Sequence, residues 1–187
     1  DGSTVGAAPA TAQGRLGSSG LSTSRIGFKG TEDLGGGLSA SFQLEGKINV
    51  DTGENANYDR PAGEANANSN YFFGRQSWVG LSGNFGKLQL GKTWTSFGDV
   101  KGKFEHADNT NVGVTADVWG TGASYDNNKP NQLKYTLPAM SGLTASSGYA
   151  FGEDKTASVS AKDTTSLNIT YDNGGPFAVG YGYQTEG

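Results

Sequence analysis

The sequence has no cysteine and is poor in apolar residues, and each of these absences excludes a class of structure. Without thiols, disulfide bridges and thiolate metal sites are excluded. No apolar run approaches the ~20 residues that a transmembrane helix needs. Hydrophobic residues make up only 34% of the 187, which is little for a soluble domain with a large core. The net charge of −4 argues against nonspecific binding to nucleic acid, which needs a basic surface.

Glycine and aromatic residues, by contrast, are abundant. There are 31 glycines, and 11% of residues are Phe, Tyr or Trp. Disordered chains are poor in aromatics, so this content argues against disorder. The combination favours short strands joined by many turns. A strand of a membrane barrel meets lipid only at every second residue, so a membrane location is compatible with the low apolar content.

A two-face alternation is clearest over residues 38–50. Successive side chains of a strand point to opposite faces, so one face is apolar and the other polar. The segment is long enough for a membrane-spanning strand, which takes about 9–11 residues. We expect the apolar set to face lipid or a subunit and the polar set to face water inside a barrel. The two sets are Leu38, Phe42, Leu44 and Ile48, and Ser39, Gln43, Glu45 and Lys47.

Further strands and turns follow the same plan along the chain. Tight turns rich in Gly, Asn or Pro alternate with long polar connections, which is typical of outer-membrane barrels. We therefore expect an all-β chain that forms an antiparallel transmembrane β-barrel. The other expected strands are 24–31, 71–82, 87–95, 132–137, 143–151, 166–172 and 177–184. The tight turns are 33–37, 83–86, 139–142 and 173–176, and the long connections are 51–69, 96–130 and 153–164.

Two runs resemble the general trimeric porins of Gram-negative bacteria. Residues 24–38, SRIGFKGTEDLGGGL, resemble the second strand and first periplasmic turn of that family. Residues 73–83, FGRQSWVGLSG, with Phe85-Gly86 and Leu90-Gly91-Lys92, resemble the next hairpin. The resemblance implies a sixteen-stranded barrel, of which residues 1–187 supply about eight strands as a single partial domain without the first strand. It also implies a homotrimer surrounded by outer-membrane lipid and lipopolysaccharide.

The resemblance assigns the long connections as well. Residues 1–23 become the first external loop, and residues 51–69 the second, which latches onto the adjacent barrel. Residues 96–130 become the third loop, which folds into the barrel and narrows the pore. An exposed loop is the alternative interpretation of 96–130. The acids of this constriction loop are Asp99, Glu105, Asp108 and Asp117.

The family places basic side chains on the barrel wall opposite that loop. Arg25 and Arg75 match its wall arginines by motif position, and Lys29 and Lys134 join them by alternation. Charged rings of this kind set ion preference. Ordinary lumen charges without a special role are the alternative. Arg75 shares parity with Val79 and Leu81, so either a bulge shifts the register or those two residues point inward.

Lys92 shares the parity of Leu88 and Leu90 and is therefore expected to point out of the barrel. A lysine facing lipid at mid-membrane costs roughly 2–4 kcal/mol. It can snorkel to the headgroups, be turned inward by a bulge, or be covered by a neighbouring subunit, and we favour the third. The acids of the second loop that could pair with it across the interface are Asp51, Glu54, Asp59 and Glu64.

No motif for catalysis, a cofactor or a metal is found. His106 is the only histidine and lies in a polar segment, where a solvated side chain is favoured over a general base. The leading hypothesis is an ungated pore for passive diffusion of small hydrophilic solutes and ions. A small outer-membrane barrel that serves as an anchor or adhesin without an open pore is one alternative, and a soluble all-β binding module is another.

Overall fold

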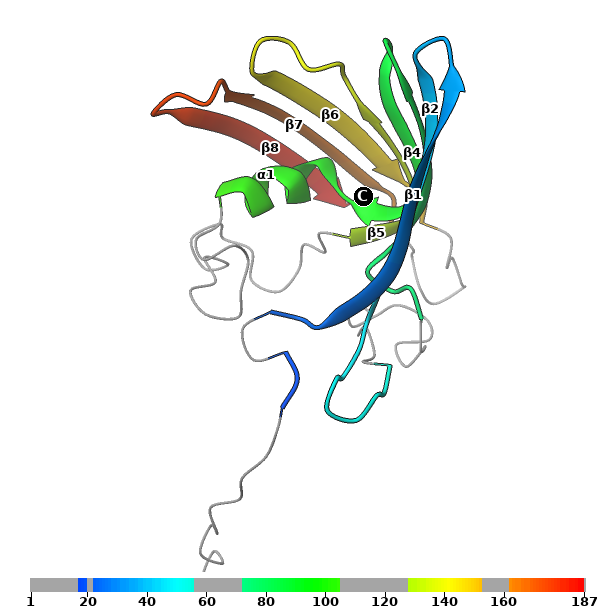
Figure 1. Ribbon diagram of the computed structural model, residues 1–187. Coiled ribbons are helices and arrows are strands. Elements are labelled where there is room, and N and C mark those ends of the chain that lie inside the picture. The colour runs from blue at the N-terminus through cyan, green and yellow to red at the C-terminus, as the bar shows by residue number, and fades with distance from the viewer. Residues whose placement is uncertain (1–16, 20–21, 56–71, 105–127, 153–161, 187) are drawn as a thin grey trace, which may run out of the picture.

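The computed structural model describes residues 17–19, 22–55, 72–104, 128–152 and 162–186. Eight strands form one antiparallel sheet in which each strand pairs with its neighbour in sequence, and the helix α1 (Ser96–Phe104) follows the fourth strand. Figure 1 shows the sheet bent like a section of a barrel wall, with α1 on its concave side. The strands are β1 (Arg25–Gly35), β2 (Leu38–Lys47), β3 (Gln76–Gly83), β4 (Gly86–Trp94), β5 (Asn128–Thr136), β6 (Leu143–Ala150), β7 (Thr164–Asp172) and β8 (Ala178–Glu186).

The four tight turns lie together at one end of the sheet, at the top of Figure 1. The β1–β2 turn is made by Gly36 and Gly37, whose φ angles of 62° and 80° favour glycine. At the β3–β4 turn, Gly86 has φ 108°, and a Cβ there would lie 2.2 Å from the carbonyl oxygen of Thr136. These turns occur where the sequence predicts them, because glycine adopts this backbone more readily than other residues do.

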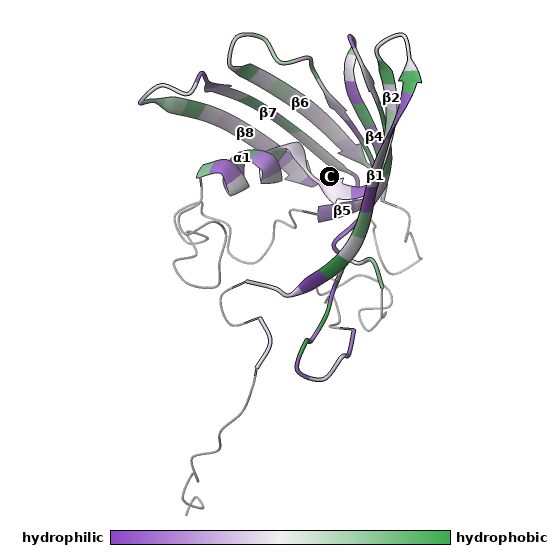
Figure 2. Cartoon of the chain, viewed as in Figure 1, coloured by the Kyte–Doolittle hydropathy of each residue, from purple (hydrophilic) through white to green (hydrophobic). Residues whose placement is uncertain are grey.

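The apolar residues of the alternation form a continuous band on the convex face. Across five strands, Phe42, Val79, Leu90, Leu133 and Tyr149 occupy successive register positions, and all five are exposed. Figure 2 shows hydrophobic and hydrophilic residues alternating along the strands. An exposed apolar band of this extent is suited to lipid.

The polar residues face the concave side, where α1 lies. One register row across β3–β8 consists of Gly80, Gln89, Lys134, Gly148, Ser166 and Gln184. Most residues buried in the described part are polar, and the buried apolar ones are Trp78, Val100 and Ala150. The orientation predicted from the alternation is thus the one observed, with the polar face inward.

Several strand boundaries differ from the prediction for local reasons. The strand expected over 71–82 begins at Gln76, because residues 72–73 form a turn that passes close over Gly46. The strand expected over 132–137 begins at Asn128, and it contains a bulge. The β4–β5 register passes from Gly91–Gln132 to Thr93–Lys129, so the extra residue lies in β5. Alternation alone does not reveal an inserted residue.

In the described ranges no helix is long and apolar enough to cross a membrane.

Candidate functional site

The helix α1 begins at a buried polar cap. The backbone N–H of Gly98 donates to Thr95 Oγ1 at 3.0 Å, and the N–H of Asp99 donates to the Thr95 carbonyl at 3.1 Å. Threonine is a preferred N-cap because its side chain satisfies an amide that the helix cannot. Thr95 has no exposed surface, so this cap fixes the helix start against the wall. The segment predicted as a constriction loop, 96–130, therefore begins with a helix, and its last residues belong to β5.

Ser96 anchors the first turn of α1 to β6 and β7. Its backbone N–H donates to Ser166 Oγ at 3.1 Å, and its carbonyl accepts from Asn168 Nδ2 at 2.8 Å. The Ser146 hydroxyl contacts Ser96 Oγ at 2.8 Å. All four residues are buried. Buried polar groups that are fully paired rigidify a structure, so the start of α1 is held firmly to the inner wall.

The apolar side of α1 packs against two glycines of β8, which have no side chains to hold the helix away. A Cβ at Gly180 would lie 2.4 Å from Phe104, and one at Gly182 would lie 3.1 Å from Phe97 and 3.4 Å from Val100. Val100 retains only 2% of its exposure. Glycine at these two inward positions lets the helix approach the sheet closely.

Lys134 and Asp99 form an ion pair that joins β5 to α1. Lys134 Nζ contacts the Asp99 carboxylate and also donates to the carbonyl of Trp94 at 3.0 Å. Lys134 is buried, whereas Asp99 keeps 41% of its side-chain surface. Burial raises the pKa of Asp99, and the Lys134 ammonium opposes that rise. Among the predicted wall cations and loop acids that lie in the described residues, these two are in contact.

Arg75 also lies on the inner side, through a local irregularity. Its backbone N–H donates to the Glu45 carbonyl although Gln76 is the register partner of Glu45. This lets Arg75 Nε reach Glu45 Oε1 at 2.6 Å. Val79 and Leu81 are exposed on the apolar face. The interpretation in which these two residues point inward is therefore wrong.

The other predicted residues lie apart from this pair. Arg25 is exposed at the start of β1, where its guanidinium donates to the Thr23 carbonyl and to Ser22 Oγ. Lys29 is exposed on the inner face of the same strand, opposite Gln43. The predicted residues Glu105, Asp108, Asp117, Asp59 and Glu64, together with His106, lie outside the described residues.

Lys92 remains on the outer face. It is the register partner of Ser77, and the bulge opposite it lies in β5, so the bulge does not turn Lys92 inward. It lines a shallow groove there with Phe72, Phe73 and Pro130. Glu54 is exposed at the beginning of the second long connection, where its carboxylate accepts a hydrogen bond from the Thr52 hydroxyl at 3.2 Å.

Two residues of the inner wall escaped the sequence prediction. Lys87 Nζ lies 4.4 Å from the centre of the Trp78 ring, and its charge is close enough to interact with Lys134 and Asp99. Lys87 precedes the outward-facing Leu88, so alternation could have placed Lys87 on the inner face. Nothing in the sequence indicates that the Trp78 ring lies against the Lys87 ammonium.

Comparison with known proteins agrees with this architecture. The Gram-negative porin family profile matches residues 3–187. The outer membrane porin protein 32 of Delftia acidovorans is 36% identical over 85% of this chain and 44% of its own length. The major outer membrane protein P.IB of Neisseria meningitidis is 32% identical over 85% of this chain and 41% of its own. The chain thus spans less than half the length of these relatives.

A solved structure has the same fold. The anion-selective porin from Comamonas acidovorans superimposes with a TM-score of 0.71 at 35% identity, over 91% of this chain and 49% of that one. The polar concave wall, the apolar convex band and the helix held inside correspond to one section of such a barrel. The chain belongs to the Gram-negative porin family and is a section of an outer-membrane β-barrel.

Proposed function

We propose that the protein containing this chain forms a water-filled channel for passive diffusion of small hydrophilic solutes and ions. The observation that carries the proposal is the helix α1, which lies on a polar wall that a lipid-facing apolar band encloses. A small barrel that serves as an anchor would instead fill its narrow interior with wall side chains and leave no room for a helix inside. Such a channel needs no cofactor and no energy source.

We further propose that the channel prefers anions. On the inner face of the described strands, basic side chains outnumber acidic ones. Electrostatic rings of one sign set the ion preference of a wide pore. The solved relative from Comamonas acidovorans is an anion-selective porin. The inner-face cations are Arg25, Lys29, Lys47, Arg75, Lys87, Lys129 and Lys134, and the acids are Asp33, Glu45, Asp172 and Glu186.

Planar-bilayer recording of the full-length protein tests both statements. We expect stepwise, voltage-independent conductance, and a reversal potential in a KCl gradient that reports chloride preference. Arg25→Ala should move the reversal potential toward cation permeability, because one wall charge is lost from a narrow passage. An unchanged reversal potential in Arg25→Ala would show that Arg25 does not contribute to ion selectivity. Absence of conductance from well-folded protein would refute the channel.

We also propose that the barrel assembles as a homotrimer, with Lys92 at the subunit interface. Its outward position on β4 and the groove beside Phe72 and Phe73 support this assignment. In the proposed contact, an acid of the neighbouring copy's 51–69 segment pairs with the Lys92 ammonium. Partial burial between barrels makes such a pair stronger than an exposed one.

Removing the ammonium of Lys92 tests the interface. We expect the Lys92→Ala trimer to dissociate at a lower temperature in detergent than the parent, measured by gel migration after graded heating. The matched control is Lys29→Ala, which removes a lysine from the inner face and is expected to leave the dissociation temperature unchanged. Equal heat resistance of Lys92→Ala and the parent would contradict this role.

A further inference from the structure

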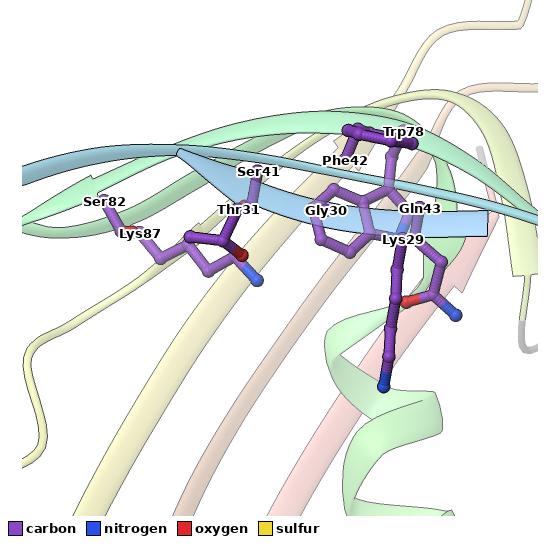
Figure 3. Close-up of a pocket in the computed structure, with 9 residues that line it drawn as sticks. All are labelled: Lys29, Gly30, Thr31, Ser41, Phe42, Gln43, Trp78, Ser82 and Lys87. Carbon is purple, nitrogen blue, oxygen red and sulfur yellow. The ribbon is translucent and has the colours of Figure 1, made fainter. Parts of the chain in front are cut away.

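A hollow of about 500 Å³ lies in the inner wall between β1 and β4. Figure 3 shows that Lys29, Gln43 and Lys87 extend from three different strands to the same side of the sheet. Thr31, Ser41 and Trp78 also line the hollow. The hollow therefore combines two ammonium groups with hydroxyl and amide groups on one rigid surface.

The two lysines of the hollow differ in their partners from four other cations on the concave side of the sheet. Carboxylates stand beside four of the cations, in the pairs Lys134–Asp99, Lys103–Asp172, Lys129–Glu186 and Arg75–Glu45. Within the described ranges, no carboxylate lies within ion-pair distance of Lys29 or Lys87. Their charges consequently remain available to a mobile anion in the lumen.

Trp78 explains how Lys87 is held without being neutralised. The ammonium lies 4.4 Å from the ring centre, within the range of a cation–π contact. An aromatic ring attracts a cation through its quadrupole but carries no net charge, so the full positive charge persists. Trp78 is itself fixed, because its indole N–H donates to Gln76 Oε1 at 2.8 Å and only 8% of its surface is exposed.

The groups in the hollow suit an anion with several acceptor atoms. Ammonium, hydroxyl and amide groups all donate hydrogen bonds, and hydrogen bonds from charged donors are the stronger kind. Ser41 Oγ is buried and has no hydrogen-bond partner. A halide is a single atom and cannot satisfy donors from separate strands together, whereas an oxyanion presents several oxygens. Resting on the proposed channel function, we propose that this hollow is a subsite that retains small oxyanions during their passage.

Titration with inorganic phosphate tests the subsite in the full-length protein. Chloride current through single channels in planar bilayers is measured as phosphate is added. We expect a saturable decrease in the parent, and a rise of the apparent dissociation constant for phosphate of about fivefold in Lys87→Met, since a charged donor is lost. Lys29→Met provides a second variant should Lys87→Met fail to assemble. Trp78→Leu should weaken phosphate binding less, because it frees the ammonium without removing it.

The control is Lys162→Met, which removes the same charge from an exposed residue before β7, outside the hollow. It is expected to bind phosphate as the parent does, and Lys87→Arg is expected to bind it nearly as well. Parent channels whose chloride current shows no saturable response to phosphate would overturn the subsite while leaving the channel function intact. So would Lys87→Met and Lys29→Met channels that match Lys162→Met. A protein that conducts no ions would overturn the channel function itself.

Discussion

Gly182→Leu is expected to push α1 away from the inner wall and to lower single-channel conductance. Even a Cβ at this position would lie 3.1 Å from Phe97 and 3.4 Å from Val100. A leucine side chain needs more room than that, and Val100 is packed too closely to yield. The first turn is held by the hydrogen bonds of Ser96, so the rest of the helix should tilt into the lumen.

The stability cost of the same substitution should be about 1–3 kcal/mol, as for overpacking in a well-packed site. Conductance in planar bilayers and unfolding in urea measure the two effects. Thr185→Leu is the matched control, because Thr185 is on the same strand but exposed on the opposite face. If Gly182→Leu channels conduct and unfold like the parent, the glycine positions on β8 do not determine where α1 lies.

Asp99→Asn is expected to increase anion preference, because it removes the negative charge that balances the Lys134 ammonium. The ammonium of Lys134 is buried, and loss of the carboxylate leaves it hydrogen-bonded to the Trp94 carbonyl at 3.0 Å. Breaking a charged hydrogen bond at such a site costs about 1–3 kcal/mol. The lower half of that range applies here, since Asp99 is partly exposed and solvent screens the pair.

The same pair predicts a pH dependence of selectivity. The pKa of Asp99 is raised by burial, so its carboxylate takes up a proton at a higher pH than an ordinary aspartate does. As the pH falls through that pKa, α1 loses a negative charge and the parent should gain anion preference. Asp99→Asn has no such group to titrate at this position, so its reversal potential should change less with pH.

Asp172→Asn is the control for the stability measurement. Asp172 pairs with Lys103, but both side chains are more than a third exposed, so the pair should contribute little to stability. We expect a stability loss in urea clearly smaller than that of Asp99→Asn. A reversal potential of Asp99→Asn that equals the parent value across the pH range would exclude Asp99 from the selectivity-determining charges.

Much of the barrel wall is predictable from local chemistry. Alternation from Leu38 to Lys47 assigns the two faces, because consecutive side chains of a strand must point to opposite sides. Glycine at Gly36, Gly37 and Gly86 marks tight turns, because their positive φ angles disfavour other residues. Neither inference needs knowledge of any distant residue.

The irregularities in the register of the strands could not be predicted in this way. Arg75 reaches Glu45 because an irregular backbone before β3 reverses the parity that simple alternation assigns. The bulge in β5, at Asn131 with φ 50°, is equally local but has no glycine to mark it. Register irregularities depend on how neighbouring strands meet, and that is a property of the sheet rather than of one segment.

Three features of the sequence therefore predict the antiparallel sheet and its polar inner face. They are the period-two alternation, the turn glycines and the order of short and long connections. Tertiary structure alone decides which wet residues act together. Lys134 contacts Asp99, and Lys87 lies over Trp78, because the packing of α1 and the pairing of β3, β4 and β5 bring them within a few ångströms. Distance in space governs electrostatic and hydrogen-bond energies, and no pattern within a single strand encodes it.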